Sequence, residues 1–458
     1  MGMHDVLNRR RFLALAGLGG IGSALAACAP APSPAPAVGT ATAVAEAPSA
    51  APAGEKAVIT FLVRDRDDIQ KKLDESQLKR FSEKFPNVEA KELYIPSAQY
   101  MDKLQTMIAA GNPPDIFNID PTSLWLTWIK NGTIIDLTDL YKRDIEFFAE
   151  WPEFFIRNQS WQGKMYGLSI DGGAVYNLWY NIGWFQEKGV QEPAVKPEES
   201  WKVNDFLTAC QALTEVENKR FAYHPFTCVW HWWPMTFGGG VIDPNDPTRC
   251  ILDKPESMEA LQFLVDLRWK YNVVPQPAQE VEGQAGRQGY VAKRIAMVHA
   301  GAWFLPTLEG SGIEAGVLYP PRGKDKLIIM GTIQLWVIYS GAKHPEMCWE
   351  FNKVRIDEQS CREMVEALGS TTPNERINRE VWLPRMEKLA QEGKGYKNYQ
   401  AFIEGYPYTY MWAQMPQEAW DVLHSELDPV WLNQKSVQEY VATTVPKVNK
   451  ILQDWWKS

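Results

Sequence analysis

The sequence is poor in the residues that build metal centres and disulfide frameworks. Its 458 residues include only six cysteines and six histidines, and neither a CxxC nor an HExxH motif occurs. Such motifs place two ligands on one turn or helix face, so their absence disfavours a zinc site or a redox dithiol. We therefore predict no metal and no cofactor. Cys228 and Cys250 flank turn-rich sequence and are the best pair for a disulfide, although free buried thiols are the favoured alternative.

Several other sequence signals are also missing. No GxGxxG or GxxxxGKS/T motif follows a predicted strand, and GxSxG does not occur, so nucleotide binding and an esterase-like nucleophile have no support. A run of about 20 strongly apolar residues, which a spanning helix needs, is absent. The net charge of −9 argues against a nucleic-acid partner.

The first 28 residues are predicted to be an export signal. Arginines at 9–11 precede the apolar segment 13–27, which is too short and too rich in Gly and Ala to span a membrane. The paired arginines resemble a twin-arginine signal, and the residues before Cys28 resemble the lipobox of bacterial lipoproteins. This resemblance implies that Cys28 carries lipid and tethers the protein to the membrane. Residues 29–57, rich in Ala and Pro, are expected to form a disordered stalk. We expect an extracytoplasmic protein, lipid-anchored to the bacterial cell membrane.

The body of the chain alternates between strand and helix patterns. A β-branched run at 58–63 precedes a helical pattern at 73–85, and a second strand is predicted at 88–95. Ser97 is placed to cap the next helix, and a third strand follows at 115–119. This β-α-β-α-β order favours a parallel sheet covered by helices, with ligands beyond the carboxyl ends of its strands. Further elements are predicted as helices at 206–213 and 257–271, strands at 294–299 and 335–340, a helix or broken helix pair at 345–368, and a mainly helical stretch to 457.

The sequence is unusually rich in aromatic residues. The 20 Trp, 17 Tyr and 18 Phe residues exceed what a core of this size needs, so we expect some rings to face a ligand. Sugars have apolar C–H faces and polar rims, and a sugar site therefore pairs flat rings with carboxylates and amides. The composition thus favours a carbohydrate ligand.

A series of motifs between residues 58 and 375 resembles the extracellular solute-binding proteins of bacterial ABC importers, the group typified by the maltose-binding protein. The motifs, in chain order, are Ala109–Phe117, Gly132–Leu137, Gly163–Leu168 before Leu178–Asn181, Asp253–Glu256, and Arg294–Met297 before Gly301–Trp303. The resemblance implies an α/β, two-lobed periplasmic-binding-protein-like fold (type II) with hinge crossings. Lobe 1 would comprise 58–171 plus 330–369, and lobe 2 would comprise 172–329 plus 370–458. It also implies a monomer that captures a solute and meets the importer's permease subunits, rather than an enzyme.

The same resemblance and the predicted strand ends supply candidate ligand contacts. Trp303 and Asp120 match the family's cleft tryptophan and carboxylate, while Arg64 and Asp65 follow the first strand. Trp336 lies at a strand start, where site and core are equally supported. The full set of predicted ligand-binding residues is Arg64, Asp65, Asp120, Asp171, Tyr176, Trp230, Trp233, Trp303, Trp336, Tyr408 and Trp412.

Alternatives to a carbohydrate importer component remain open from the residues alone. A polyamine would suit acidic and aromatic side chains through cation–π contacts. A secreted carbohydrate-active enzyme would use paired carboxylates. A surface sensor or adhesion module could use the same fold without an importer.

Overall fold

A computed structural model describes most of the chain after the predicted stalk. The described residues are 56–64, 68–119, 123–169, 172, 174–225, 230–280, 285–323, 327–393, 396–411 and 415–457. The predicted signal, Cys28 and all but the last two residues of the predicted stalk lie outside this part of the chain.

A five-stranded sheet, which we call the sheet of lobe 1, combines four strands from the N-terminal part of the chain with β14 from much later in the sequence. Its strand order is β2-β1-β3-β14-β6, in which β1 runs parallel to β2 and β3, whereas β14 is antiparallel to β3 and β6. The central strands are buried because their side chains are almost entirely apolar. The strands are β1 (Ala57–Val63), β2 (Val88–Tyr94), β3 (Ile116–Ile119), β6 (Leu168–Ser169) and β14 (Leu335–Ile338).

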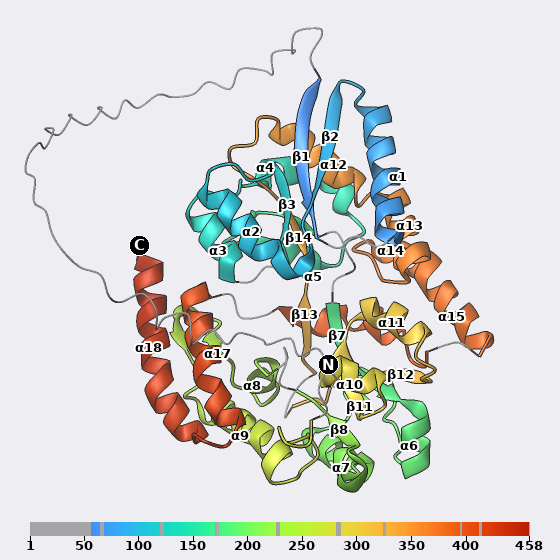
Figure 1. Ribbon diagram of the computed structural model, residues 1–458, viewed down its shortest axis with the longest axis vertical. Helices are drawn as coiled ribbons and strands as arrows, with labels where there is room; N and C mark the ends of the chain where they lie inside the picture. The colour runs from blue at the N-terminus through green and yellow to red at the C-terminus, as the bar shows by residue number, and fades with distance from the viewer. Residues whose placement is uncertain are drawn as a thin grey trace, which may run out of the picture. The chain divides into compact units, whose positions relative to one another are not determined.

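Helices cover both faces of this sheet. Figure 1 shows α2 and α3 on one side of the strands and α1 and α13 on the other. Tyr100 of α2 ties its helix to the sheet, because its hydroxyl donates to the carbonyl of Asn118 at 2.9 Å. The helices of lobe 1 are α1 (Asp68–Lys84), α2 (Ser97–Ala109), α3 (Ser123–Lys130), α4 (Thr138–Arg143), η2 (Ile145–Phe148), α5 (Glu153–Asn158), α12 (Pro345–Val354) and α13 (Glu358–Leu368).

A second, six-stranded sheet forms the centre of lobe 2. Its order is β15-β13-β7-β11-β8, with β12 also paired to β7. The long strand β7 is antiparallel to β11, β12 and β13, so it links most of the sheet. The strands are β7 (Ala174–Asn181), β8 (Phe221–Tyr223), β11 (Ile295–Ala300), β12 (Ala315–Leu318), β13 (Ile329–Thr332) and β15 (Thr409–Met411).

The remaining elements pack around this second sheet, join the two lobes or, in the case of the β4–β5 ribbon, lie against α4 and α5 of lobe 1. Two short ribbons are formed by β4 (Ser160–Trp161) with β5 (Lys164–Met165) and by β9 (Ile242–Asp243) with β10 (Asp246–Cys250). The helices are α6 (Ile182–Lys188), η3 (Pro197–Glu199), α7 (Val203–Leu213), η4 (Val216–Asn218), α8 (Trp232–Thr236), α9 (Pro255–Trp269), α10 (Gly286–Val291), η5 (Ala302–Phe304), α11 (Leu305–Glu309), α14 (Glu375–Ile377), η6 (Asn378–Trp382), α15 (Leu383–Gln391), α16 (Ala401–Glu404), η7 (Tyr406–Tyr408), α17 (Gln417–Trp431) and α18 (Val437–Lys457).

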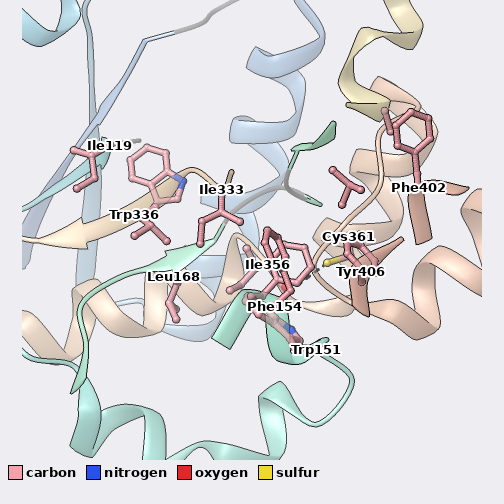
Figure 2. Packing of buried hydrophobic residues seen from close by; sticks show 14 of the residues in the cluster. Ile119, Trp151, Phe154, Leu168, Ile333, Trp336, Ile356, Cys361, Phe402 and Tyr406 are labelled. Carbon is pink, nitrogen blue, oxygen red and sulfur yellow. Dashed lines mark hydrogen bonds between the residues drawn. The ribbon is translucent and has the colours of Figure 1, made fainter. Parts of the chain in front are cut away.

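Two large apolar clusters hold these elements together. One extends from the sheet of lobe 1 to β7 and β11 of lobe 2, and the other fills the space between β8, α9, α17 and α18. Figure 2 shows part of the first cluster, where Trp336 of β14 lies among Ile119, Leu168 and Ile333. Burying rings of this size stabilises each lobe by several kcal/mol per aromatic side chain.

The predicted order of elements is confirmed along the described residues, with one local difference at Ser97. The stretch at 345–368, predicted as a helix or a broken helix pair, is a broken pair, α12 and α13, separated at Arg355–Asp357. Ser97 is the first residue of α2 and not its cap, since Pro96 precedes the helix and supplies no side-chain hydrogen bond. None of the helices in the described residues combines the length and apolar character that a membrane crossing requires.

Candidate functional site

A cavity of about 230 Å³ lies where helices of lobe 1 meet the segment that follows β11 of lobe 2. It is large enough for part of a small organic ligand, since complete ligand sites usually enclose ~300–1,000 Å³. Its lining combines apolar, amide, hydroxyl and guanidinium groups from distant parts of the chain. The lining residues are Gln70, Leu73, Gln77, Trp303, Pro306, Gln334, Arg355, Met364, Leu368 and Ser370.

Lobe 2 contributes an exposed aromatic ring to this cavity. Trp303 lies in η5, three residues after β11 ends, and Gly301 precedes the helix in an extended conformation. Its exposed fraction is 36%, while the other tryptophans in the described residues are buried or half-buried. Tyr176 of β7 packs edge-on against the indole with 6.3 Å between ring centroids. The Arg287 guanidinium lies 5.0 Å from the same ring. The indole is therefore supported from behind and presents apolar surface to the cavity.

Lobe 1 contributes polar groups from α1, from the turn between α12 and α13, and from Gln334 and Ser370 outside the helices. The buried face of α1 carries Leu73, Asp74, Gln77 and Phe81, so polar residues occupy positions where a helix normally packs apolar ones. Arg355 follows α12 and is only 4% exposed. A buried guanidinium requires a counter-charge and hydrogen-bond acceptors, and the neighbouring residues supply part of this requirement.

The counter-charge of Arg355 comes from α1. Its Nη2 donates to Asp74 Oδ1 at 3.2 Å, and both side chains are almost completely buried. The guanidinium also lies over the Trp336 ring, 4.0 Å from the centroid. Burial lowers the pKa of Arg355, while the nearby carboxylates of Asp74 and Glu92 oppose that shift. These contacts fix the plane of the guanidinium at the edge of the cavity.

Several polar atoms around this ion pair have no hydrogen-bond partner within the protein. They are Arg355 Nε and Nη1, Asp74 Oδ2 and Gln77 Oε1, all buried. A buried polar group without a partner costs about 1–3 kcal/mol, so such groups are rare in native proteins. Unpaired donors and acceptors therefore lie together next to the cavity.

The structure places the predicted ligand-binding residues in different surroundings. Trp303 lines the cavity and Tyr176 supports it from behind. Trp336 is 2% exposed and lies against Arg355, so it belongs to the core that underlies the site. Arg64 stands 5.9 Å from the Tyr100 ring, and the half-buried Tyr408 lies in η7; neither lines the cavity.

The tryptophans before the glycine-rich turn differ from the expectation for ligand-facing rings. Trp230 and Trp233 are 2% and 0% exposed and pack inside lobe 2. The Trp230 indole donates to His424 Nε2 at 3.1 Å, and its ring stacks with Trp420. Adjacent side chains can all be buried here because α8 is a short helix enclosed on several sides.

Histidines share this aromatic interior. Burial lowers the pKa of His299 to about 4, and the adjacent Tyr176 carbonyl, 3.3 Å from Nδ1, opposes the shift. Burial also lowers the pKa of His231 to about 3, with the nearby His424 acting in the same direction. Both imidazoles are therefore neutral at pH 7, which fits packing roles for them.

Four predicted ligand-binding residues, Asp65, Asp120, Asp171 and Trp412, lie outside the described residues. Gln77 and Arg355 line the cavity but were not among the predicted residues. A usable signal existed for Gln77, because Asp74 and Gln77 lie one helical turn before the apolar Leu78 and Phe81 of the helix predicted at 73–85. No comparable signal marked Arg355.

Cysteine, histidine and acidic side chains form no second functional site in the part of the chain that the structure describes. Cys250 is a buried free thiol whose pKa is raised to about 12 by burial. The predicted partner, Cys228, lies outside the described residues, so the alternative of buried thiols applies to Cys250. No cluster of three or more His, Cys, Asp or Glu side chains suited to a metal ion occurs among the described residues.

Comparisons with known proteins agree with this architecture. A family model described as "bacterial extracellular solute-binding protein" matches residues 76–391. An uncharacterized ABC transporter extracellular-binding protein of Pyrococcus horikoshii is 22% identical over 297 residues, 60% of this chain and 62% of the relative. The diacetylchitobiose binding protein DasA of Streptomyces coelicolor is 23% identical over 56% of this chain and 60% of the relative. The chain thus spans about three fifths of the length of these curated relatives.

Solved structures share the fold over most of the chain. An ABC substrate-binding protein of Listeria monocytogenes, Lmo0181, in complex with cycloalternan, matches with a TM-score of 0.75 and 21% identity. A solute-binding protein of Thermotoga lettingae bound with α-D-tagatose matches with a TM-score of 0.70 and 22% identity. Each match covers 87% of this chain and 100% of the other. The two-lobed periplasmic-binding-protein-like fold is thereby confirmed.

Proposed function

Because the chain belongs to the bacterial extracellular solute-binding protein family, we propose that it binds a carbohydrate between its lobes and delivers it to an ABC importer. The observation that carries the choice of ligand is the cavity in which the exposed Trp303 ring opposes the polar groups of Gln77 and Arg355. An indole face suits the C–H surface of a sugar, and amide and guanidinium groups suit its hydroxyls. The sugars named for the Listeria and Thermotoga structures support the same choice.

The cavity lining argues against the polyamine alternative. Arg355 is paired with Asp74, and Gln70, Gln77, Gln334 and Ser370 are neutral. A polyamine needs carboxylates that can pair with its ammonium groups, and the described lining of this cavity contains no carboxylate. The described lining therefore fits a neutral hydroxylated ligand better than a polycation.

Transport follows from coupling ligand binding to lobe closure. Ligand held between lobes favours a closed arrangement through its differential contacts with the two states, and the closed surface would meet the permease subunits. The predicted lipid on Cys28 would keep the monomer near those subunits, on the outer side of the cell membrane. The protein would release its sugar unchanged, without enzymatic activity.

A thermal-shift and calorimetric screen of the purified protein tests this proposal. The panel contains maltotriose, mannotriose, galactotriose and diacetylchitobiose, with spermidine and glycerol 3-phosphate as chemically distinct competitors. A sugar at about 100 times its dissociation constant should stabilise the protein by about 2.7 kcal/mol. Trp303→Ala should weaken that sugar at least tenfold, because the stacking surface is removed.

Three outcomes would contradict the proposal. Stabilisation by spermidine alone would favour a polyamine binder, and a wild-type protein that binds no sugar in the panel would remove the grounds for a carbohydrate. Release of shorter products from a bound oligosaccharide, detected by chromatography, would instead indicate a carbohydrate-active enzyme.

A further inference from the structure

The ion pair beside the cavity leaves hydrogen-bonding capacity of both kinds unused. Arg355 has two nitrogens that can donate, and Gln77 has a carbonyl oxygen that can accept, all buried and without a protein partner. Both residues line the cavity and both are 4% exposed. A ligand that supplies only donors would leave the two Arg355 nitrogens unsatisfied, and one that supplies only acceptors would leave Gln77 Oε1 unsatisfied.

We propose that Arg355 and Gln77 form a subsite that selects an uncharged sugar unit with neighbouring hydroxyl groups, and that Asp74 positions Arg355 for this task. The inference rests on the proposed function and specifies its substrate class. A hydroxyl group both donates and accepts, so one hydroxyl can accept from Arg355 while its neighbour donates to Gln77 Oε1. Two adjacent hydroxyls on a sugar ring provide this combination.

The charge balance explains why the selected unit is uncharged. Asp74 already neutralises Arg355 through the 3.2 Å contact between Oδ1 and Nη2. A ligand carboxylate would add a second negative charge near Asp74 and would offer no donor to Gln77 Oε1. The subsite therefore discriminates against acidic sugars, although it contains an arginine.

The surroundings hold the subsite rigid before a ligand arrives. The guanidinium is stacked on Trp336, and Gln70 Nε2 donates to Asp74 Oδ1 at 3.2 Å. Because the ring lies against the face of the guanidinium and the carboxylate binds Nη2 at its edge, the unpaired donors keep a fixed direction. Such preorganisation reduces the ordering cost of binding and sharpens discrimination between similar ligands.

The test uses matched ligands and matched variants of the full protein. Each neutral oligosaccharide of the panel is compared with its derivative in which one terminal hydroxymethyl group is oxidised to a carboxylate. The double variant Asp74→Leu/Arg355→Met removes both charges together, which avoids leaving one of them buried alone. Titration calorimetry gives the dissociation constants, and thermal unfolding of the ligand-free protein reports whether each variant is folded.

The control removes a second carboxylate–guanidinium pair between α1 and α13. Arg80 Nη1 lies 3.1 Å from Glu363 Oε2, and neither residue lines the cavity. Arg80→Met/Glu363→Leu should leave the dissociation constant of the neutral sugar within twofold of wild type. The double variant Asp74→Leu/Arg355→Met should instead raise the dissociation constant of the neutral sugar about 10- to 100-fold, because it removes charge-assisted hydrogen bonds.

Asp74→Asn separates positioning from simple structural support. This change keeps the size of the side chain but leaves Arg355 without its counter-charge. The neutral sugar should bind more weakly, and the acidic derivative should gain at least tenfold relative to it. A purely structural role would weaken both ligands equally.

The results distinguish this inference from the proposed function. A wild-type protein that prefers the acidic derivative would overturn the subsite, as would a double variant that binds the neutral sugar as tightly as wild type. In both cases sugar binding itself would stand. Failure of wild type to bind any sugar of the panel would overturn the proposed function and this inference together.

Discussion

The two walls of the cavity are built on opposite physical principles. Lobe 1 brings polar side chains to the site and buries them, so that Arg355 and Gln77 are each only 4% exposed. Lobe 2 brings an apolar ring to the site and leaves it partly uncovered, with Trp303 at 36%. Polar groups thus lie where apolar ones are normal, and an aromatic ring lies where polar groups are normal.

This difference shows how one wall of a site can supply affinity while the other supplies specificity. An exposed indole loses its hydration readily when a sugar face covers it, and its contribution tolerates many sugars. Buried donors and acceptors stabilise only a ligand that pairs with all of them, because each mismatch leaves a group unsatisfied. We therefore assign general stacking to the wall of lobe 2 and discrimination to the wall of lobe 1.

The largest expected effect comes from breaking the charge pair of lobe 1. Arg355→Met leaves Asp74 buried without its guanidinium, and loss of one member of a buried pair typically costs about 3–5 kcal/mol. The double variant Asp74→Leu/Arg355→Met should recover most of this loss, since neither charge remains. The measurement is the free energy of unfolding from urea denaturation followed by tryptophan fluorescence.

This prediction fails if the single variant loses less than about 1 kcal/mol, or if the double variant is no more stable than the single one. Either result would mean that water or another side chain already satisfies Asp74. The walls of lobe 1 and lobe 2 would then differ in how exposed their side chains are, but not in the presence of unsatisfied polar groups.

A second, smaller effect on stability should appear when His299, which packs behind the wall of lobe 2, is protonated at low pH. His299 lies beside the Tyr176 carbonyl and packs against Tyr223 and Trp232, and burial lowers its pKa to about 4. Its unfolded-state pKa is ~6.5, so below that value the unfolded chain binds a proton that the folded protein resists. Stability from this group is complete above pH 6.5 and is lost as pH falls towards 4.

Between pH 7 and pH 5 the loss from His299 should be about 2 kcal/mol, since one pKa unit corresponds to ~1.4 kcal/mol. His299→Phe keeps a ring in the same packing and cannot be protonated, so its stability should fall less steeply over this interval. Urea denaturation of wild type and variant at pH 5, 6 and 7 measures the slopes. Equal slopes would show that the imidazole is protonated inside the folded protein.

The sequence was sufficient for the frame of lobe 1 because local patterns there agree with the final packing. The β-α-β-α-β segment from residue 57 to residue 119 has apolar strands, amphipathic helices and clear turn residues, and each element formed where predicted. Trp303 could be placed beyond a strand end because Gly301–Trp303 follows a strong strand pattern, and the structure shows that this residue lines the cavity.

Burial of individual side chains could not be predicted, because it depends on contacts between distant segments. Trp230 and Trp233 resemble Trp303 in type and in closeness to glycine, but α17 and α9 cover them. The sequence pattern makes Arg355 a surface residue after a helix, and its contacts with Asp74, 281 residues earlier, and with the Trp336 ring explain its burial. Rings that pack in the core and the ring that lines the cavity therefore look alike in the sequence.

The smallest expected effect on stability comes from removing the exposed ring itself. Trp303→Ala eliminates edge-on contacts with Tyr176 and Phe304, each with centroids more than 6 Å apart, and opens no enclosed cavity. Aromatic pairs contribute about 0.5–1.5 kcal/mol each, and two widely spaced pairs at the low end of this range predict a loss of about 1 kcal/mol in the ligand-free protein. Trp303→Phe should lose less still, because a smaller ring keeps part of both contacts.

The expected pattern for Trp303→Ala is therefore a variant that unfolds almost like wild type but gains little stability from added sugar. A loss of 3 kcal/mol or more in the ligand-free protein would place Trp303 among the packing rings of lobe 2 and would remove the distinction between the two walls.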